Sequence, residues 1–395
     1  MKAIIEGRTV PSSHLGELIE TSVESSNTVL RKNFDRDGYL LLRNVIKKNK
    51  IKKARNEIFK KLHEINEIKS PFIEGIASGK SNRDKVYKNR GQFWKFISEL
   101  DVLRDITHGK ELKNIFDKIF GLPSVGFDFI FLRPVSKGKS TNMHCDTGFF
   151  TRKTKKVLTC WLVFTELSID RGPLFVIENS HNFEDVKKEF LDFDVAIHKD
   201  KKAMIDINPI DFAKDRNSKI LTSDFRPGDA LIFGMHTLHG TFQNHAKDNK
   251  IRLTCDIRFQ PESEPKDPRY FGANPGGTTG IGYGELNSAR PLNEDWHSRW
   301  FYFLNFELEN ILDFNLTEEQ LSLQLKARTF VDKYIKKEAI LRDKIQNAKD
   351  RIPWDWIKLA DQEGFRTMGI PKEYGGTDQS ILNMCIVGEE FGVGD

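Results

Sequence analysis

The residues best placed to do chemistry are His144 and Asp146, which stand two positions apart soon after the apolar run at 127–134. Residues two apart on an extended strand point to the same face, so this imidazole and this carboxylate can reach the same point in space. One further histidine from a later strand would complete a set of two histidines and one carboxylate. Such a set holds Fe(II) on one face and leaves the opposite positions open for a cosubstrate and O2.

The third ligand is predicted to be His239, which follows the turn and strand at 227–233. A β-barrel could return this stretch to the strand that carries His144, because the residues between them suffice for several intervening strands. His236 and His245 lie close by in the sequence and are the alternatives.

A second pair with the same spacing, His198 and Asp200, competes with the first pair. It opens the stretch HKDKKAM, and a cluster of lysines is typical of a solvated turn or strand end. We therefore interpret His198 as a surface residue and place the predicted metal site at His144.

An iron site of this kind also needs a cation inside the barrel, to hold the distal carboxylate of an oxo-acid cosubstrate. Arg252 is the candidate, because it begins the apolar strand at 251–260 and its planar guanidinium can bind a carboxylate through two parallel hydrogen bonds. Thr241 lies two residues beyond His239, on the same strand face, and could donate its hydroxyl to that carboxylate. Arg258, in the same strand as Arg252, is the alternative.

The elements that must position these residues are short strands. From Val125 onward the chain consists of brief apolar runs separated by turns that contain glycine and proline, which is typical of a sandwich or barrel rather than of alternating β–α units. We therefore expect a mainly β fold with flanking helices. The predicted strands lie at 127–134, 157–167, 174–178, 203–208, 219–225, 229–234 and 251–260.

The first part of the chain has a different pattern. Residues 14–70 show helical periodicity around one apolar strand at 39–45. The polar stretch at 70–91, rich in glycine and serine, is predicted to be a loop, and 93–120 is predicted to be helical, ending near Gly121.

The chain becomes helical again after about Asn315. Thr317 and Gln320 fit a capping box ahead of an apolar-periodic run, and a second helical segment at 353–364 ends in glycine. We expect an oxygenase domain at 1–310, made of N-terminal helices (1–124), a barrel (125–262) and a Gly-rich tail (263–310), followed by a helical segment at 311–395.

The bulk composition excludes several classes of protein. With 38% hydrophobic residues and 30 phenylalanines, the chain is typical of a folded protein rather than a disordered one. The net charge of +5 is modest and its lysines are dispersed, so we expect small anionic ligands rather than nucleic acid. No apolar run fits a membrane span or a signal peptide, so we expect a cytoplasmic protein without a membrane partner. The four cysteines show no C-x-x-C pairing and are predicted to be free thiols.

Taken in order, the motifs resemble the phytanoyl-CoA dioxygenase family of Fe(II)/2-oxoglutarate oxygenases. The opening Phe34-x-x-x-Gly38-Tyr39 is similar to the N-terminal signature of that family. The later motifs are His144-x-Asp146, Cys160–Leu167, Arg171–His181, Pro227-Gly-Asp229, Leu238-His239-Gly-Thr241, Asn244 and Arg252.

This resemblance implies a double-stranded β-helix, a jelly-roll barrel of the cupin-like kind. It also implies a dioxygenase that hydroxylates a small molecule or an acyl thioester, uses 2-oxoglutarate and O2, and releases succinate and CO2. An aspartate at position 146 argues against a halogenase, which would have glycine or alanine there to leave room for a halide. In the implied site, Fe(II) is bound by His144, Asp146 and His239, the cosubstrate carboxylate is bound by Arg252 and Thr241, and the cosubstrate pocket is lined by Asn142 and Trp161.

The C-terminal segment resembles the N-terminal helical domain of acyl-CoA dehydrogenases. The matching residues are Leu316–Gln320, Arg328-x-Phe330, Pro353, Leu359-Ala360, Gly364, Ile370–Gly376 and Glu389-Glu390. The β-domain and C-terminal helices that bind flavin in that family do not follow, so a flavin-linked dehydrogenase is not expected. The alternative to the oxygenase is a non-catalytic barrel that binds a metal or ligand, with the helical segment recruiting a partner or a second copy of the chain.

Overall fold

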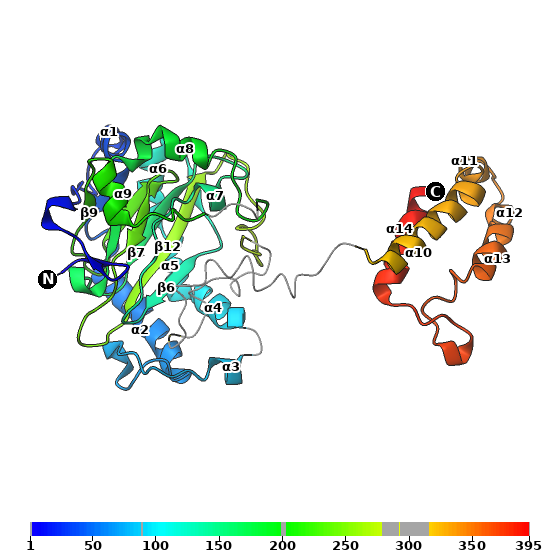
Figure 1. The fold of residues 1–395 in the computed structure, drawn as a ribbon, viewed down its shortest axis with the longest axis horizontal. Helices are drawn as coiled ribbons and strands as arrows, with labels where there is room; N and C mark the ends of the chain where they lie inside the picture. Colours follow the sequence, from blue (N-terminus) through cyan, green and yellow to red (C-terminus); the bar gives the residue numbers. More distant parts are fainter. Residues whose placement is uncertain (1, 88–89, 199–202, 279–291, 293–315, 395) are drawn as a thin grey trace. The chain divides into compact units, whose positions relative to one another are not determined.

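The computed structural model divides into two compact units, Met1–Leu304 and Asn305–Asp395, and we describe each unit by itself (Figure 1). The residues that the structure describes are 2–87, 90–198, 203–278, 292 and 316–394. None of the helices in these ranges is long and apolar enough to cross a bilayer.

The N-terminal unit is built around two β-sheets. The larger sheet has the order β4 (Tyr39–Leu42), β10 (Ala230–Gly234), β7 (Leu158–Val163), β12 (Arg252–Pro261) and β5 (Ser124–Gly126), with β6 (Phe131–Val135) also paired to β12. The smaller sheet has the order β11 (His239–Thr241), β8 (Leu174–Ile177), β9 (Ile220–Thr222) and β3 (Leu15–Glu17). A short hairpin of β1 (Ile4–Ile5) and β2 (Arg8–Thr9) precedes them.

The two sheets pack face to face. One buried cluster joins Trp161 and Phe233 of the larger sheet to Leu174 and Val176 of the smaller one. The pairings are antiparallel except for β3 with β9, and in the larger sheet β12 and β7 lie side by side over six residue pairs from Thr254↔Val163 to Phe259↔Leu158 (Figure 1). The predicted mainly β fold, a double-stranded β-helix with flanking helices, is confirmed.

Helices cover the outer face of the larger sheet. The apolar faces of these helices share one core with outward-facing strand residues such as Leu162 and Ile257. The predicted helix end at Gly121 is confirmed, because this glycine adopts a left-handed conformation and caps the preceding helix. The stretch at 93–120, however, holds three helices rather than one. The covering helices are α1 (Asn27–Asp37), α2 (Lys48–Glu64), α4 (Arg90–Ser98), α5 (Asp101–Thr107) and α6 (Lys110–Phe120).

The smaller sheet is covered by shorter helices. Residues of α8 (Glu184–Glu189) and α9 (Pro209–Asp215) pack on the outward side chains Phe175 and Ile177 of β8. The short α7 (Thr147–Phe150) follows the predicted metal site directly.

Three predictions of local structure were wrong. The helical pattern predicted from residue 14 does not hold at its start, because Leu15–Glu17 form strand β3 and α1 begins only at Asn27. The run at 203–208 forms no strand, because Asn208 caps α9 and the chain turns into that helix, which leaves only a single β-bridge at Met204. The predicted loop at 70–91 contains the short helix α3 (Arg83–Val86), whose Arg83 forms a fully buried ion pair with Glu67. The glycine-rich stretch at 280–284 lies outside the described residues.

The C-terminal unit is helical. The predicted capping box is present at α10 (Glu318–Phe330), where Thr317 and Gln320 exchange side-chain and backbone hydrogen bonds. Phe330 stacks on Phe391 in the core of this unit, and Phe365 packs edge-on against Phe391. The remaining helices are the π-helical turn Val331–Ile335, α11 (Ala339–Asp343), α12 (Ala348–Arg351), α13 (Trp354–Gln362) and α14 (Ile381–Gly394).

Candidate metal centre and its pocket

His144, Asp146 and His239 lie close together and are all buried. Each offers one ligand atom, and these three atoms fall within 4.8 Å of one another. The Nε2 atoms of His144 and His239 are 3.8 and 4.0 Å from the same oxygen, Oδ1 of Asp146. Two imidazoles and one carboxylate at these separations can coordinate a single metal ion.

The two histidines are brought together by backbone pairing. His144 and His239 lie directly opposite each other and exchange both of their backbone hydrogen bonds, each 2.9 Å long. In an antiparallel pair such opposite residues hold their side chains on the same face. The pairing of His239 with Val176 on the other side of β11 fixes this edge to the smaller sheet.

The expectation that His144 and Asp146 share an extended strand was wrong. Asp146 has φ −82° and ψ −7° and stands at the N-terminal boundary of α7, so the chain has left the extended conformation by this residue. The carboxylate still reaches Nε2 of His144, but it does so from the start of a helical turn and not from the next pleat of a strand.

Both imidazoles are oriented by backbone carbonyl groups. Nδ1 of His144 lies 2.8 Å from the carbonyl oxygen of Asn142, and Nδ1 of His239 lies 2.9 Å from that of Thr237. When Nδ1–H donates to a carbonyl, the lone pair of Nε2 is left free for a metal. Burial, reinforced by the neighbouring His239, lowers the pKa of His144 to about 3, and burial also lowers the pKa of His239. Both side chains are therefore neutral near pH 7, as metal ligands must be.

Asp146 is held through its second oxygen. Oδ2 accepts a hydrogen bond of 2.6 Å from the Thr159 hydroxyl and one of 2.9 Å from Nη2 of Arg258, while Oδ1 faces the two imidazoles. Burial alone would raise the pKa of this carboxyl, but Arg258 and the two histidines lower it well below its usual range. The carboxylate is thus ionised and points one oxygen at the place where a metal would bind.

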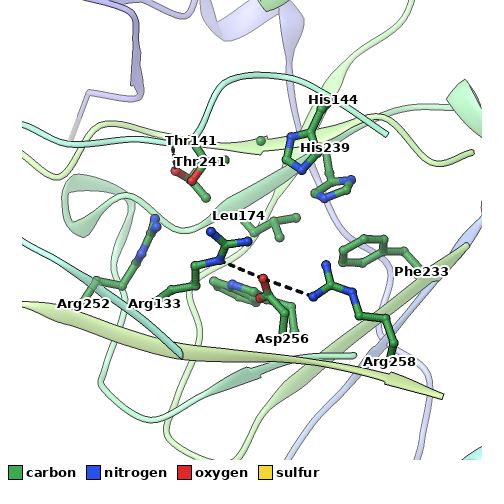
Figure 2. Close-up of a pocket in the computed structure, with 12 residues that line it drawn as sticks. Arg133, Thr141, His144, Leu174, Phe233, His239, Thr241, Arg252, Asp256 and Arg258 are labelled. Carbon is green, nitrogen blue, oxygen red and sulfur yellow. Dashed lines mark hydrogen bonds and ion pairs between the residues drawn. The ribbon is translucent and has the colours of Figure 1, made fainter. Parts of the chain in front are cut away.

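A pocket opens beside these ligands. Figure 2 shows His144 and His239 on one side of it, with the side chains of Asp256 and Arg258 facing them across the pocket. The residues that line it are Arg133, Thr141, His144, Trp161, Leu174, Phe233, His239, Gly240, Thr241, Arg252, Asp256 and Arg258.

Arg252 and Thr241 both line this pocket, as the sequence predicts for a carboxylate site. The Arg252 side chain is 1% exposed and donates from Nη1 to the carbonyl of Gly172, yet its Nε has no hydrogen-bond partner among the described residues. The hydroxyl oxygen of Thr241 accepts from the backbone N–H of Thr141 at 2.7 Å, which leaves its own hydrogen free to donate. A buried guanidinium with an unused donor and a hydroxyl that can donate, both lining one pocket, fit the distal carboxylate of a 2-oxo acid.

Gly172 makes the position of Arg252 possible. It adopts φ +72°, and a Cβ atom there would lie 2.4 Å from the carbonyl oxygen of Phe242. Only glycine can therefore close this turn so tightly and present its carbonyl to the arginine.

Arg258, the alternative to Arg252 as the arginine inside the barrel, lines the same pocket. Both arginines are therefore available to bind anionic groups there. Arg252, Thr254, Asp256 and Arg258 alternate along β12 with side chains such as Cys255 that pack in the core under the helices. Asp256 and Arg133, which form an ion pair of 2.9 Å in the pocket, are not among the predicted site residues. Polar residues stand at every second position in 252–258, which places Asp256 on the same strand face as Arg252 and Arg258. This alternation was the signal in the sequence that could have identified Asp256.

The remaining predicted residues are placed as follows. Trp161 lines the pocket, whereas Asn142 is not among the lining residues and contributes its carbonyl to His144. His198 is exposed, and its predicted partner Asp200 lies outside the described residues. The alternatives, His236 and His245, contact the Thr147 hydroxyl and the Gln243 carbonyl instead of the metal centre.

Solved structures of similar fold and low sequence identity include the following two. The 2-oxoglutarate-dependent carbocyclase SnoK from nogalamycin biosynthesis is 15% identical over 64% of this chain and 90% of its own, with a TM-score of 0.43. The apo form of EctD from S. alaskensis is 14% identical over 73% of this chain and 90% of its own, also with a TM-score of 0.43.

Among curated proteins, the peroxisomal phytanoyl-CoA dioxygenases of Homo sapiens and Mus musculus are similar to this chain. The human protein is 21% identical over 233 residues, which cover 57% of this chain and 66%, just under two thirds, of the human protein. The mouse protein is 20% identical over 262 residues, which cover 64% of this chain and 74% of the mouse protein.

Two family models match the chain. The N-terminal domain of acyl-CoA dehydrogenases matches residues 317–395, as the resemblance of the C-terminal segment predicts. The phytanoyl-CoA dioxygenase (PhyH) model matches residues 34–252, a span that contains all three buried ligand residues and ends at Arg252. This match covers more than half of the chain, which therefore belongs to the phytanoyl-CoA dioxygenase family.

Proposed function

We propose that the N-terminal unit is a dioxygenase that depends on Fe(II) and 2-oxoglutarate and hydroxylates a small organic substrate, with release of succinate and CO2. The observation that carries this proposal is that a potential metal site and a potential carboxylate-binding site lie at the same pocket. Three ligand atoms of His144, Asp146 and His239 lie within 4.8 Å of one another, and the buried pair of Arg252 and Thr241 lines the same pocket. Membership of the PhyH family supports the same chemistry.

The protein's own groups have separate tasks in this proposal. The Nε2 atoms of His144 and His239 and Oδ1 of Asp146 would hold Fe(II), which supplies the oxidising chemistry when bound with 2-oxoglutarate and O2. Arg252 and Thr241 would bind the distal carboxylate of the cosubstrate and so fix its orientation. These roles follow from donors and acceptors that are already in place without any ligand.

The pocket also restricts access of water. Phe233 packs against the ring of His239 in a tilted arrangement with centroids 4.3 Å apart, and Phe149 packs edge-on against His144. Both phenylalanines and Trp161 are buried. An apolar wall around the ligands would strengthen electrostatic contacts in the site and limit side reactions with solvent.

The names of the relatives suggest a substrate class. The human and mouse proteins are named for phytanoyl-CoA, so an acyl thioester is one candidate substrate class and a smaller organic molecule is another. We also propose that the oxygenase domain ends near residue 310 and that the acyl-CoA dehydrogenase-like segment at 311–395 is a separate folding unit.

The test is conversion of 2-oxoglutarate to succinate by the purified full chain with added Fe(II). We expect turnover above the rate without protein, and stimulation by compounds that resemble the true substrate. A protein that binds Fe(II) and 2-oxoglutarate but forms no succinate with any compound of a broad library would instead support a non-catalytic binding barrel.

A further inference from the structure

The charge of the pocket is not balanced by its own residues. Arg133, Arg252 and Arg258 line it, and the acidic groups that contact these arginines are Asp256 and, beside the pocket, Asp146. Three guanidinium groups against two carboxylates leave one formal positive charge. Fe(II) and a doubly charged 2-oxoglutarate would cancel each other, so the fully loaded site would still carry this excess charge.

Arg258 has donors that nothing in the described chain uses. Its side chain is 3% exposed, and only Nη2 donates, to Asp146. Nε and Nη1 are buried without a hydrogen-bond partner. The rings of Phe131 and Phe150 lie 4.6 and 4.1 Å from its Cζ atom, so the faces of the guanidinium are occupied and only its edge remains for a ligand.

Arg133 lies close to the same carboxylate oxygen as Arg258, Oδ2 of Asp256. It comes from β6, which pairs with β12, and its Nε donates to Oδ2 of Asp256 at 2.9 Å. Nη1 of Arg258 lies 3.9 Å from that same oxygen. The Asp256 carboxylate therefore lies between two guanidinium groups, as Figure 2 shows, and Asp146 is the second carboxylate that contacts Arg258.

Arg252 is a separate site along the same strand. Arg252 and Arg258 face the same pocket from positions that are roughly 20 Å apart on an extended strand. A cosubstrate carboxylate held by Arg252 and Thr241 would therefore leave the buried Nε and Nη1 donors of Arg258 still without a hydrogen-bond partner among the described residues.

We propose that Arg133 and Arg258 form a second anion-binding subsite, which takes a carboxylate group of the primary substrate. This inference rests on the proposed function, since the substrate is the molecule that enters the loaded site. Buried donors without a hydrogen-bond partner are costly, and a carboxylate of the substrate would satisfy those of Arg258 and offset the one excess positive charge of the pocket when it binds. The substrate class is then an organic acid, free or as part of a larger molecule, rather than a neutral compound.

The test uses acetate as the smallest carboxylate and acetamide as its neutral isostere. Binding is measured by saturation-transfer NMR to the full chain loaded with Zn(II), which is redox-inert and diamagnetic, and with saturating 2-oxoglutarate. We expect saturable binding of acetate and none of acetamide.

A series of charge variants makes the test specific. Arg133→Gln should weaken acetate binding by about tenfold, the loss expected for one charge-assisted pair, and Arg133→Lys should retain most of the affinity. Asp256→Asn should strengthen binding. The double variant Arg133→Gln/Asp256→Asn has the same net charge as the wild type and should recover much of its affinity, which separates the effect of charge from a loss of folding.

Three outcomes would overturn the inference. The first is the absence of saturable acetate binding by the loaded wild type, and the second is equal binding of acetamide. The third is acetate binding that occurs with Zn(II) alone and disappears when 2-oxoglutarate is added, because the subsite would then belong to the cosubstrate. A failure of the proposed dioxygenase function would appear separately, as a lack of succinate formation with Fe(II).

Discussion

Arg258 of β12 donates a hydrogen bond of 2.9 Å to Oδ2 of Asp146, a carboxylate whose other oxygen faces two imidazoles. The guanidinium thereby fixes which oxygen of the carboxylate is available to a metal. The arrangement is an outer-shell contact of the type that orients ligands and tunes their affinity.

Replacing Arg258 should weaken metal binding without removing any ligand. We expect Arg258→Gln to lower the affinity for Co(II) by about 10- to 100-fold, because Asp146 would lose one of its two orienting donors. Isothermal titration calorimetry measures this directly. Arg258→Lys keeps the charge and should recover part of the affinity, while Arg133→Gln, which makes no hydrogen bond to Asp146, should bind Co(II) as the wild type does. Unchanged affinity in Arg258→Gln would show that Thr159 alone orients the carboxylate.

Turnover should depend on the buried aspartate and not on the second His-x-Asp pair. Asp146→Ala removes the only carboxylate of the buried ligand set and should abolish succinate formation. His198→Ala changes an exposed side chain and should leave turnover nearly intact. Equal loss of activity in the two variants would contradict the assignment of the metal centre.

The cosubstrate should lose affinity when Arg252 is removed. A charge-assisted pair is worth about 1.5–3 kcal/mol, so Arg252→Ala should raise the apparent constant for 2-oxoglutarate by roughly 10- to 150-fold. Iron binding should be retained, because Arg252 is not within hydrogen-bonding reach of the three ligand residues in the described structure. If Arg258→Ala raised this constant and Arg252→Ala did not, the two arginines would have exchanged roles.

The metal-free protein should lose stability as the pH falls below about 6.5. The pKa of His144 is lowered from its usual value near 6.5 to about 3, so the unfolded chain binds a proton over this window and the folded chain does not. The free energy of unfolding should therefore decrease between pH 6.5 and pH 4. Urea denaturation at several pH values measures this slope.

His144→Asn is the matched variant for the pH experiment. It removes the imidazole while keeping a polar side chain, so the slope between pH 6.5 and 4 should become smaller, with His239 accounting for part of what remains. A slope that is identical in the variant would mean that His144 does not contribute to acid sensitivity.

The C-terminal helical unit should be dispensable for the oxygenase reaction. It has its own buried clusters around Phe330, Trp356 and Met368. We expect a protein truncated near Leu312, a position outside the described residues, to keep 2-oxoglutarate turnover and to bind no FAD, with at most a change in oligomeric state or solubility. Loss of all turnover in a truncated protein that still folds and binds iron would contradict the domain division.

The sequence predicted the elements of the fold better than the details of the site. Apolar runs bounded by turns located most strands of the two sheets, because strands that are covered on both faces, such as β7 and β8, are apolar along their whole length. The short strands β3 and β5 carry no such run and were not predicted. The prediction of a strand failed at 203–208, where Ile207 is 51% exposed and the capping of α9 by Asn208 overrides the apolar pattern.

In the site, the spacing of His144 and Asp146 suggested a shared strand, yet the two ligand atoms meet through a strand end and a helical turn. Arg133 was missed for a different reason. It pairs with Asp256 across 123 positions of sequence, and no local pattern indicates which arginine of a strand will meet which carboxylate of another.

The ten residues of β12 are all buried, with charged groups on one face and apolar groups on the other. A shift of this strand by a single position would exchange the two faces and push Arg252, Asp256 and Arg258 among the side chains under the helices. Such a shifted chain could not pay the cost of burying those charges. The correct register of β12 is therefore required both for a stable fold and for a pocket lined by these charged residues. A sheet with the wrong register would be unstable, so it would not accumulate as a folded but inactive form.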